Sequence, residues 1–524
     1  MGSTGDHAAP PAVELIGLNK SFGPVRANRD VSMAVARGAI HGIVGENGAG
    51  KSTLMGMLYG FYQADSGRIR VNGRDVRITS PAHAISQGIG MVHQHFMLVE
   101  PFTVLENVVL GAEEGGLIKT SLRHARRELE RLGREYGLEV DPDAVVGDLP
   151  VGLQQRVEIL KALYRGAETL ILDEPTGVLT PQEADRLFAM LDTLRGQGRT
   201  VILITHKLRE IMAATDTVSI MRRGTMVAHR TTAETSKEEL AELMVGRKVL
   251  LRVEKTEAAP GEPILELDKV NFSDAAGVPR LRDVSLTLRR GEILGVAGVS
   301  GNGQSELLEV LSGVAAPTSG TILFKGEVIA GNGKRTDPLG MHRLGVGHVA
   351  EDRHRTAMVM DFTAAENMIL GYHTGRDVNG RVLMDRGKVR RLCRDYMDRF
   401  DVRPPDPDLP ATGFSGGNQQ KIVLAREMER DPDLLLVGQP TRGVDIGAIE
   451  FIHKQLIELR DHGKGVLLVS VELDEILSLA DRIVVMFDGR IVGEMAARDA
   501  DECSLGLLMA GCTGSRDKNG GEAA

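Results

Sequence analysis

The sequence feature that most constrains the fold is an internal duplication. The stretch "VARGAIHGIVGENGAGKSTLMGMLYG" at 35–60 recurs as "LRRGEILGVAGVSGNGQSELLEVLSG" at 288–313. Two further pairs follow in the same order: "LPVGLQQRVEILKAL" (149–163) with "FSGGNQQKIVLAREM" (414–428), and "TLILDEPTGVLT" (169–180) with "LLLVGQPTRGVD" (434–445). A repeat of this length is a whole domain rather than a short solenoid unit. The chain of 524 residues is therefore predicted to contain two similar domains in tandem.

The domain boundaries are predicted from changes in composition. The stretch "RVEKTEAAPGEP" between the two copies is charged, contains proline and glycine, and has no hydrophobic period, which is typical of a linker. Both ends of the chain are rich in small and polar residues, which is typical of disordered tails. We assign 1–12 to a disordered tail, 13–248 to the first domain, 249–263 to the linker, 264–512 to the second domain and 513–524 to a second disordered tail.

Each copy is predicted to be an α/β domain. Strands that look antiparallel come first, followed by an apolar strand, a glycine-rich loop and a helix. Long charged helices are expected over 121–136 and 385–400. Further apolar strands then alternate with helices, a pattern that indicates a parallel sheet covered on both faces.

Composition argues against several classes of function. With 63 basic and 72 acidic residues the net charge is −9, which disfavours nucleic-acid binding. A basic cluster at 123–134 could still contact phosphates, but Glu128 and Glu130 within it favour a solvated helix face. The three cysteines, Cys393, Cys503 and Cys512, are scattered, which favours a reducing compartment over a disulfide framework or zinc site.

No targeting or membrane segment is expected. No apolar run approaches the roughly 20 residues that a membrane-spanning helix needs. The first residues, "MGSTGDHAAPPA", lack the apolar core of a signal peptide, so we expect the chain to stay in the compartment where it is made. Any work at a membrane then requires a partner.

The first copy contains a phosphate-binding loop, which we call the first loop. The sequence "GENGAGKST" follows an apolar strand and opens a helix, as such a loop requires. Its glycines let backbone N–H groups approach phosphates, Lys51 can reach the terminal phosphates, and the Ser52 hydroxyl can bind Mg²⁺. A chance glycine-rich turn is the alternative. The predicted ATP-binding residues of the first loop are Gly45, Glu46, Asn47, Gly48, Ala49, Gly50, Lys51, Ser52 and Thr53.

Further polar residues follow apolar strands of the same copy. Asp173 and Glu174 end the strand "LILD", where Asp173 can hold Mg²⁺ through water and Glu174 can activate the attacking water. The alternative is a pair of helix-capping carboxylates. His206 ends another apolar strand and could contact the terminal phosphate, although a lone histidine there could also be a core residue. Gln94 completes the set, and we interpret His93 and His95 beside it as loop residues.

These motifs, in this order, resemble those of ABC transporter ATPases over nearly the whole chain, twice. The resemblance implies two tandem P-loop NTPase domains, each with a mixed or parallel core sheet, an antiparallel β subdomain and a helical subdomain. It also implies ATP hydrolysis with ATP and Mg²⁺. The implied catalytic residues are Glu174, His206, Gln94 and Lys51, and the implied metal-site residues are Ser52, Gln94 and, through water, Asp173. Phe22 stands where the family stacks an aromatic ring on adenine, although it could equally be a core residue.

In that family two domains stack head to tail, and each ATP lies between one loop and the signature motif of the opposite domain. The second copy keeps the signature residues Ser415, Gly416, Gly417 and Gln419. The first copy has Pro150 in place of the serine, which removes a hydroxyl and a backbone donor. The resemblance therefore pairs the first loop with Ser415 of the second copy.

The second copy departs from the pattern at each catalytic position. The changes are Lys51 to Gln304, Thr53 to Glu306, Gln94 to Glu351, Asp173 to Gly438, Glu174 to Gln439 and His206 to Val471. The phosphate lysine, a metal-site carboxylate and the general base are all lost. We therefore expect one hydrolytic site, and a second loop, Gly298–Glu306, that is silent or only binds nucleotide.

The resemblance is greatest to the ATPase subunits of bacterial importers for simple sugars and nucleosides. Sugar-branch members generally keep an "LDEP"-like sequence in the second half, so Gly438 and Gln439 favour nucleosides over sugars. The implied partners are transmembrane permease subunits, two in number, and through them an extracytoplasmic substrate-binding protein. The implied location is the cytoplasmic face of the membrane. No nucleic acid and no second copy of the chain are expected to be needed.

The segment "HFMLVEPFTVLENV" after Gln94 is expected to form part of a groove for a permease helix. Its apolar residues could instead pack in the core. A soluble ABC protein of ribosomes or DNA is a competing class, but its members carry long basic linkers, coiled coils or zinc modules that are absent here. A purely regulatory subunit is disfavoured because the first copy retains every catalytic group.

Overall fold

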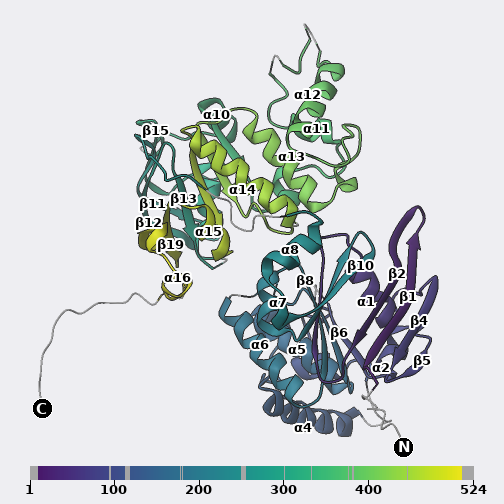
Figure 1. Cartoon of the computed structure of the whole chain (residues 1–524). Coiled ribbons are helices and arrows are strands. Elements are labelled where there is room, and N and C mark those ends of the chain that lie inside the picture. The colour runs from purple at the N-terminus through teal and green to yellow at the C-terminus, as the bar shows by residue number, and fades with distance from the viewer. Residues whose placement is uncertain are drawn as a thin grey trace, which may run out of the picture. The chain divides into compact units, whose positions relative to one another are not determined.

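The computed structural model divides into two compact units, Met1–Val249 and Leu250–Ala524 (Figure 1). The first unit runs from purple to teal in the figure and the second from teal-green to yellow. Both units have the predicted α/β architecture, which confirms the tandem fold. The residues that the structure describes are 10–93, 96–112, 118–176, 179, 181–248, 255–299, 301–331, 333–375, 377–380, 383–444, 446–509 and 511.

The first unit is built on a six-stranded sheet with the order β10-β9-β3-β8-β7-β6. All neighbours in it are parallel except β9 and β10. Every residue of β3 and β8 is buried, because helices cover both faces of a parallel sheet. The strands are β3 (Ile40–Val44), β6 (Ile89–Val92), β7 (Thr169–Asp173), β8 (Thr200–Thr205), β9 (Thr217–Arg222) and β10 (Thr225–Thr231).

A second, antiparallel sheet has the order β2-β1-β4-β5. Its strands are β1 (Val13–Phe22), β2 (Val25–Val35), β4 (Ser66–Val71) and β5 (Arg74–Val76). Ala12, which we assigned to the disordered tail, is buried beside this sheet. Its N–H donates to Val35 and its carbonyl accepts from Asn72, so pairing with two neighbours orders the chain before the predicted boundary.

The helices of the first unit form a cover for the large sheet and a separate helical group. The helices α3, α4 and α5 pack on one another through apolar residues such as Val108, Leu129 and Leu160. The charged face of α4 points away from this cluster, as its amphipathic pattern predicts. The helices are α1 (Lys51–Tyr59), α2 (Pro81–Ser86), α3 (Val104–Val109), α4 (Ile118–Tyr136), α5 (Val151–Tyr164), α6 (Pro181–Gly196), α7 (Leu208–Ala214) and α8 (Lys237–Val245).

The second unit repeats both sheets, with the orders β12-β11-β14-β15 and β16-β17-β18-β13-β19-β20. Its strands are β11 (Pro263–Ser273), β12 (Pro279–Arg289), β13 (Ile293–Ala297), β14 (Ser319–Phe324), β15 (Glu327–Ala330), β16 (Val346–Val349), β17 (Leu434–Gly438), β18 (Gly465–Ser470), β19 (Arg482–Phe487) and β20 (Arg490–Ala496). Its helices are α9 (Gln304–Leu311), α10 (Pro338–Leu344), α11 (Ala364–Met368), α12 (Arg386–Arg399), α13 (Gly416–Met428), α14 (Ile446–Asp461), α15 (Leu473–Leu479) and α16 (Glu502–Met509).

Local sequence signals recur at equivalent places in the two units. Thr103 and Glu106 form a capping box at the start of α3, and Thr363 and Glu366 form another at α11. Part of the predicted linker is bound to the second unit, because Lys255 donates to backbone carbonyls at the end of α15. None of the described helices is long and apolar enough to span a bilayer.

Candidate functional site

The first loop connects the centre of the large sheet to α1. Gly50 caps α1 with a φ of 98°, and a side chain there would place Cβ 2.4 Å from the carbonyl oxygen of Ala27. A Cβ at Gly45 would lie 2.4 Å from the carbonyl oxygen of Met221. Both positions therefore require glycine, and the backbone of the loop is held closely against β2 and β9.

Lys51 lies inside the curve of the first loop. Its Nζ donates to the carbonyl oxygens of Gly45, at 2.7 Å, and Glu46, at 3.1 Å. The side chain is buried, and burial lowers its pKa, while the charges of Glu174 and Asp173 act in the opposite direction. An ammonium group held at this place can meet the phosphates that the loop's N–H groups would bind.

Asp173 ends β7 and meets the first turn of α1. Its carboxylate accepts a hydrogen bond from the Ser52 hydroxyl. Burial and the neighbouring charge of Glu174 raise the pKa of Asp173, with Ser52 and Lys51 opposing the shift. A hydroxyl and a carboxylate brought together in this way are oxygen ligands of the kind that Mg²⁺ prefers, so the donor set fits the metal.

Glu174 and His206 follow the neighbouring strands β7 and β8, which brings them into contact. His206 Nδ1 lies 2.9 Å from Glu174 Oε1. Burial alone would raise the pKa of Glu174, but the hydrogen bond and charge of His206, with Lys51 and Lys207, outweigh it and leave the pKa lowered. Glu174 is therefore ionised at neutral pH and can accept a proton.

The backbone at Glu174 is strained. Its φ is 47°, a left-handed conformation that is uncommon for a residue other than glycine. The Glu174 N–H donates to the carbonyl oxygen of Ile204 at 2.9 Å, which holds this conformation. Gln439, at the same place in the second unit, also has a φ of 47° and bonds in the same way to Val469. Both units therefore have the strained turn, but only the first unit has a carboxylate at this position.

Two other residues of the first unit, Gln94 and Phe22, were predicted from the sequence to belong to the site. Gln94 lies outside the described residues, so its predicted place at the metal and the attacking water stays a prediction. Phe22 ends β1 and is 43% exposed, so the alternative interpretation of Phe22 as a core residue is wrong. Its ring packs on Tyr62, a neighbour that the sequence analysis did not single out.

The loop of the second unit has a different set of contacts. Gln304 takes the place of the lysine, and its Nε2 donates to the carbonyl oxygen of Val299 at 3.1 Å. Gln439 Oε1 accepts from the Val471 N–H, where the first unit has a carboxylate next to a histidine. An amide cannot take a proton from water as Glu174 can.

A carboxylate nevertheless reaches the serine of the second loop from a different strand. The Ser305 hydroxyl donates to Glu351, which stands where the first unit has Gln94. A Cβ at Gly438 would lie 2.5 Å from Cγ of Glu351. The missing aspartate side chain and the added glutamate are therefore linked, because Glu351 occupies the space that a side chain at residue 438 would need.

The signature residues of the second unit surround the start of α13. Ser415 is the exposed N-cap residue, and its Oγ accepts from Asn418 rather than from the helix backbone. Gly416 and Gly417 form the first turn. Gln419 is buried, and its amide group bonds within the unit, donating to Ala411 and accepting from His354. In the first unit Pro150 caps α5 with no side-chain hydrogen bond.

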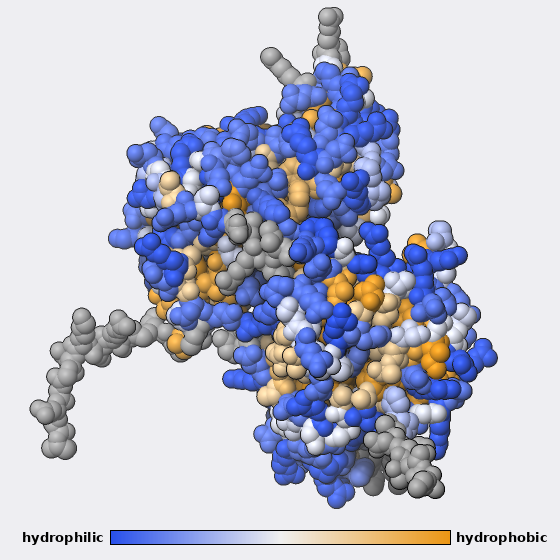
Figure 2. Space-filling model, in the orientation of Figure 1, coloured by the Kyte–Doolittle hydropathy of each residue, from blue (hydrophilic) through white to orange (hydrophobic). Residues whose placement is uncertain are grey.

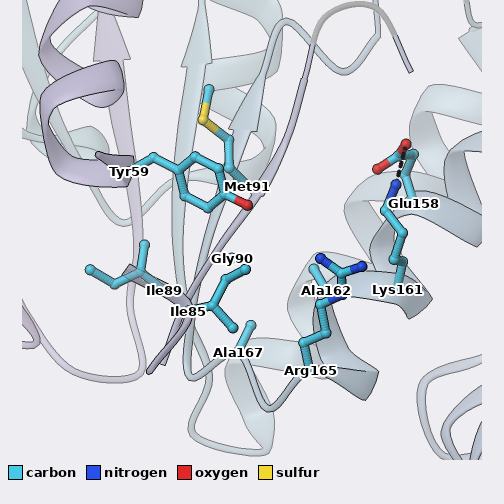
Figure 3. A pocket seen from close by; sticks show the side chains of 10 residues that line it. All are labelled: Tyr59, Ile85, Ile89, Gly90, Met91, Glu158, Lys161, Ala162, Arg165 and Ala167. Carbon is cyan, nitrogen blue, oxygen red and sulfur yellow. Dashed lines mark hydrogen bonds and ion pairs between the residues drawn. The ribbon is translucent and has the colours of Figure 1, made fainter. Parts of the chain in front are cut away.

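Sequence reasoning missed a set of charged residues on α5. Lys161 Nζ donates to Glu158 at 2.9 Å, the dashed contact in Figure 3, and to the carbonyl oxygen of Met97 at 2.8 Å. Arg165 donates to the carbonyl oxygen of Leu110. These residues border a small pocket with Tyr59 and tie α5 to the segment after Gln94. No local motif identifies them, because the Met97 and Leu110 carbonyl groups that they contact are distant in sequence.

Comparison with known proteins gives the same organisation in two similar domains. The family described as ABC transporter matches residues 28–177 and 281–442, one range within each copy. The guanosine import ATP-binding protein NupO of Bacillus subtilis is 46% identical over 96% of this chain and 98% of its own length. The nucleoside import ATP-binding protein NupA of Lactococcus lactis is 45% identical over 95% and 98%, and the glucose import ATP-binding protein TsgD13 of Haloferax volcanii is 44% identical over 96% of both.

Proposed function

The chain belongs to the ABC transporter family of ATP-hydrolysing proteins, and we propose that it uses ATP at its first loop to drive the import of nucleosides. The observation that carries the proposal is the group formed by Lys51, Asp173, Glu174 and His206, which has no counterpart in the second unit. Two of the relatives above are named for guanosine or nucleoside import, which supports the substrate class.

In this proposal each group of the first loop has a distinct role. Lys51 and the loop N–H groups hold the phosphates of ATP. Glu174, which is ionised at neutral pH, accepts the proton of the attacking water, and His206 holds its carboxylate in place. Ser52, Asp173 and Gln94 would hold Mg²⁺, which when bound supplies positive charge against the transferring phosphoryl group. The remaining loop residues contribute backbone N–H groups.

The signature residues of the second unit complete ATP binding in this proposal. Ser415 offers an exposed hydroxyl that is not used to cap its own helix, and Gly416 and Gly417 add no side chains of their own to the first turn of α13. Gln419 would act indirectly, by holding the turn before Ser415 through its bonds to Ala411 and Phe414.

The proposed partners are two transmembrane permease subunits and, through them, an extracytoplasmic substrate-binding protein. The chain would lie on the cytoplasmic face of the membrane as a peripheral subunit. Figure 2 shows hydrophilic residues over most of the visible surface of each unit, so exposed apolar residues stand out. In the first unit Met97 and Phe102 are exposed on the segment expected to receive a permease helix, and Leu110 is exposed just after it.

Turnover of the purified chain tests the catalytic assignment. We expect Glu174→Gln to lower the ATPase kcat by about 10²- to 10⁴-fold, the usual contribution of a general base, and to preserve ATP binding. Gln439→Ala, the matched change in the second unit, should leave kcat close to that of the parent. Retained turnover in Glu174→Gln, or an equal loss in Gln439→Ala, would contradict the assignment.

Transport measurements test the substrate class. Cells that lack the chain should lose uptake of labelled nucleosides while uptake of labelled glucose and pentoses continues, and Glu174→Gln should fail to restore it. The second candidate is sugar import, which the 44% identity with TsgD13 supports. Loss of sugar uptake with unchanged nucleoside uptake would favour that candidate, and unchanged uptake of both would contradict the importer proposal.

A further inference from the structure

Two half-exposed aromatic rings meet in the first unit. Phe22, at the end of β1, and Tyr62, three residues after α1, are each 43% exposed. Their ring centroids are 5.1 Å apart and the ring planes cross at 78°, an edge-to-face arrangement that aromatic side chains prefer. Apolar rings that remain open to water on an ordered surface often indicate a place where a ligand binds.

The position of the two rings is set by the elements that carry the first loop. Tyr62 packs against α1 at Gly56, where a Cβ would lie 2.9 Å from the tyrosine ring. Phe22 pairs with Val25 across the turn from β1 to β2, and β2 then reaches the loop, where the Asn28 side chain donates to the carbonyl oxygen of Gly50. Both rings are therefore attached to the two elements that border the phosphate-binding residues.

The second unit lacks both rings. The hydrogen bonds of Asn19 to Gly17 and Asp30 recur at Asn271 with Lys269 and Asp283, so Phe22 corresponds to Asp274. Asp274 accepts from the N–H groups of its own turn and from Arg280, which replaces an aromatic surface by a charged one. In each unit a glycine with a positive φ lies two residues before the second position, Gly60 before Tyr62 and Gly313 before Ala315. Tyr62 therefore corresponds to Ala315. The aromatic pair therefore occurs only in the unit that keeps the phosphate lysine.

We propose that Tyr62 is a positioning residue for base recognition, holding the Phe22 ring in the orientation that stacks on the adenine of ATP. The inference rests on the proposed function, because it requires ATP at the first loop. Stacking on an aromatic face is available to any base, and its strength depends on the orientation of the ring. An edge-to-face neighbour fixes that orientation, since the hydrogen-bearing edge of one ring meets the face of the other.

Phe61 provides a matched control. It is also an exposed aromatic residue of the segment after α1, but its ring packs on Tyr59 and His93. Tyr59 lines the pocket of Figure 3. Removal of Phe61 takes away a similar apolar area and leaves Phe22 and Tyr62 in place.

The experiment measures binding of ATP and of inorganic tripolyphosphate to the full chain carrying Glu174→Gln. Tripolyphosphate presents the phosphates without the base, so it reports on Lys51 and the loop alone. Tyr62→Leu, which keeps apolar bulk at the position, should raise the Kd for ATP by about 2- to 10-fold, the range expected for loss of an edge-to-face pair. The Kd for tripolyphosphate should stay unchanged, and Tyr62→Phe should bind ATP like the parent.

In the chain that keeps Glu174, Tyr62→Leu should raise KM for ATP with kcat unchanged. Unchanged ATP binding in Tyr62→Leu would overturn the inference, and so would equal weakening of both ligands or an effect of Phe61→Leu as large as that of Tyr62→Leu. A parent chain that binds tripolyphosphate but shows no preference for ATP would also overturn it. A parent that binds neither ligand would contradict the proposed function itself.

Discussion

Replacement of Gly438, at the end of β17, by aspartate should not make the second loop hydrolytic. At Gly438 an added Cβ would lie 2.5 Å from Cγ of Glu351 and 2.8 Å from Cδ1 of Leu308, distances at which atoms overlap. Gly438→Asp must therefore displace Glu351, and overpacking of this kind costs about 1–3 kcal/mol. The new carboxylate would also meet Glu351, whose pKa burial already raises.

Calorimetric unfolding of the purified full chain measures the cost. For a domain of this size about 2–4 °C of Tm is lost per kcal/mol, so the second unit should unfold roughly 2–12 °C earlier in Gly438→Asp. ATP turnover should not rise, because Gln304 and Gln439 still lack a charge and a general base. The double variant with Glu351→Ala removes the side chain that the aspartate meets.

In the Glu351→Ala background, the change Gly438→Asp should cost less stability than it does in the parent. The difference should be about 0.5–3 kcal/mol, the usual coupling between residues in contact. The reasoning would be refuted by a Gly438→Asp chain that unfolds at the temperature of the parent. It would also be refuted by a chain in which this single change produces a second hydrolytic site.

Two further predictions concern buried charge in the first unit. Burial, with the charge of His229, lowers the pKa of His41 to about 4, so the unfolded chain binds more protons than the folded one between pH 6.5 and 4. The contribution of His41 to the free energy of unfolding should therefore be fully present above pH 6.5 and should fall by up to about 3 kcal/mol as the pH drops to 4. His41→Gln should flatten this decline in urea titrations at a series of pH values, and an unchanged slope would count against the assignment. Lys161→Met would leave Glu158, whose side chain is 1% exposed, without its cation and should cost about 3–5 kcal/mol in urea unfolding. The double change Glu158→Leu with Lys161→Met should recover most of that loss, and a single variant as stable as the parent would show that the pair does not matter.

Much of the fold was predictable because its signals are local and occur twice. Apolar runs such as 40–44 and 200–205 became fully buried parallel strands, and the charged stretches expected at 121–136 and 385–400 became α4 and α12. The boundaries were less predictable. Ala12 and Lys255 look like tail and linker residues in composition, but each pairs with partners far along the chain.

The candidate site was predictable to the extent that it consists of motifs. The contact between Glu174 and His206 follows from their positions at the ends of strands that became neighbours in a parallel sheet. Gln419 shows the limit of this reasoning. A glutamine in a signature motif is interpreted as a ligand contact, whereas the structure buries it and uses its amide group inside the second unit.

The sequence by itself determined that two similar units exist, that the first retains the lysine and carboxylates for ATP chemistry, and that the second has lost them. These conclusions depend on residue identity at fixed spacing, which the sequence contains in full. Only the tertiary structure decided that Glu351 reaches Ser305 across the space left by Gly438, and that Tyr62 meets Phe22 beside the first loop. The physical reason is that these contacts join different strands and helices, whose side chains come together only when the sheet and its covering helices pack.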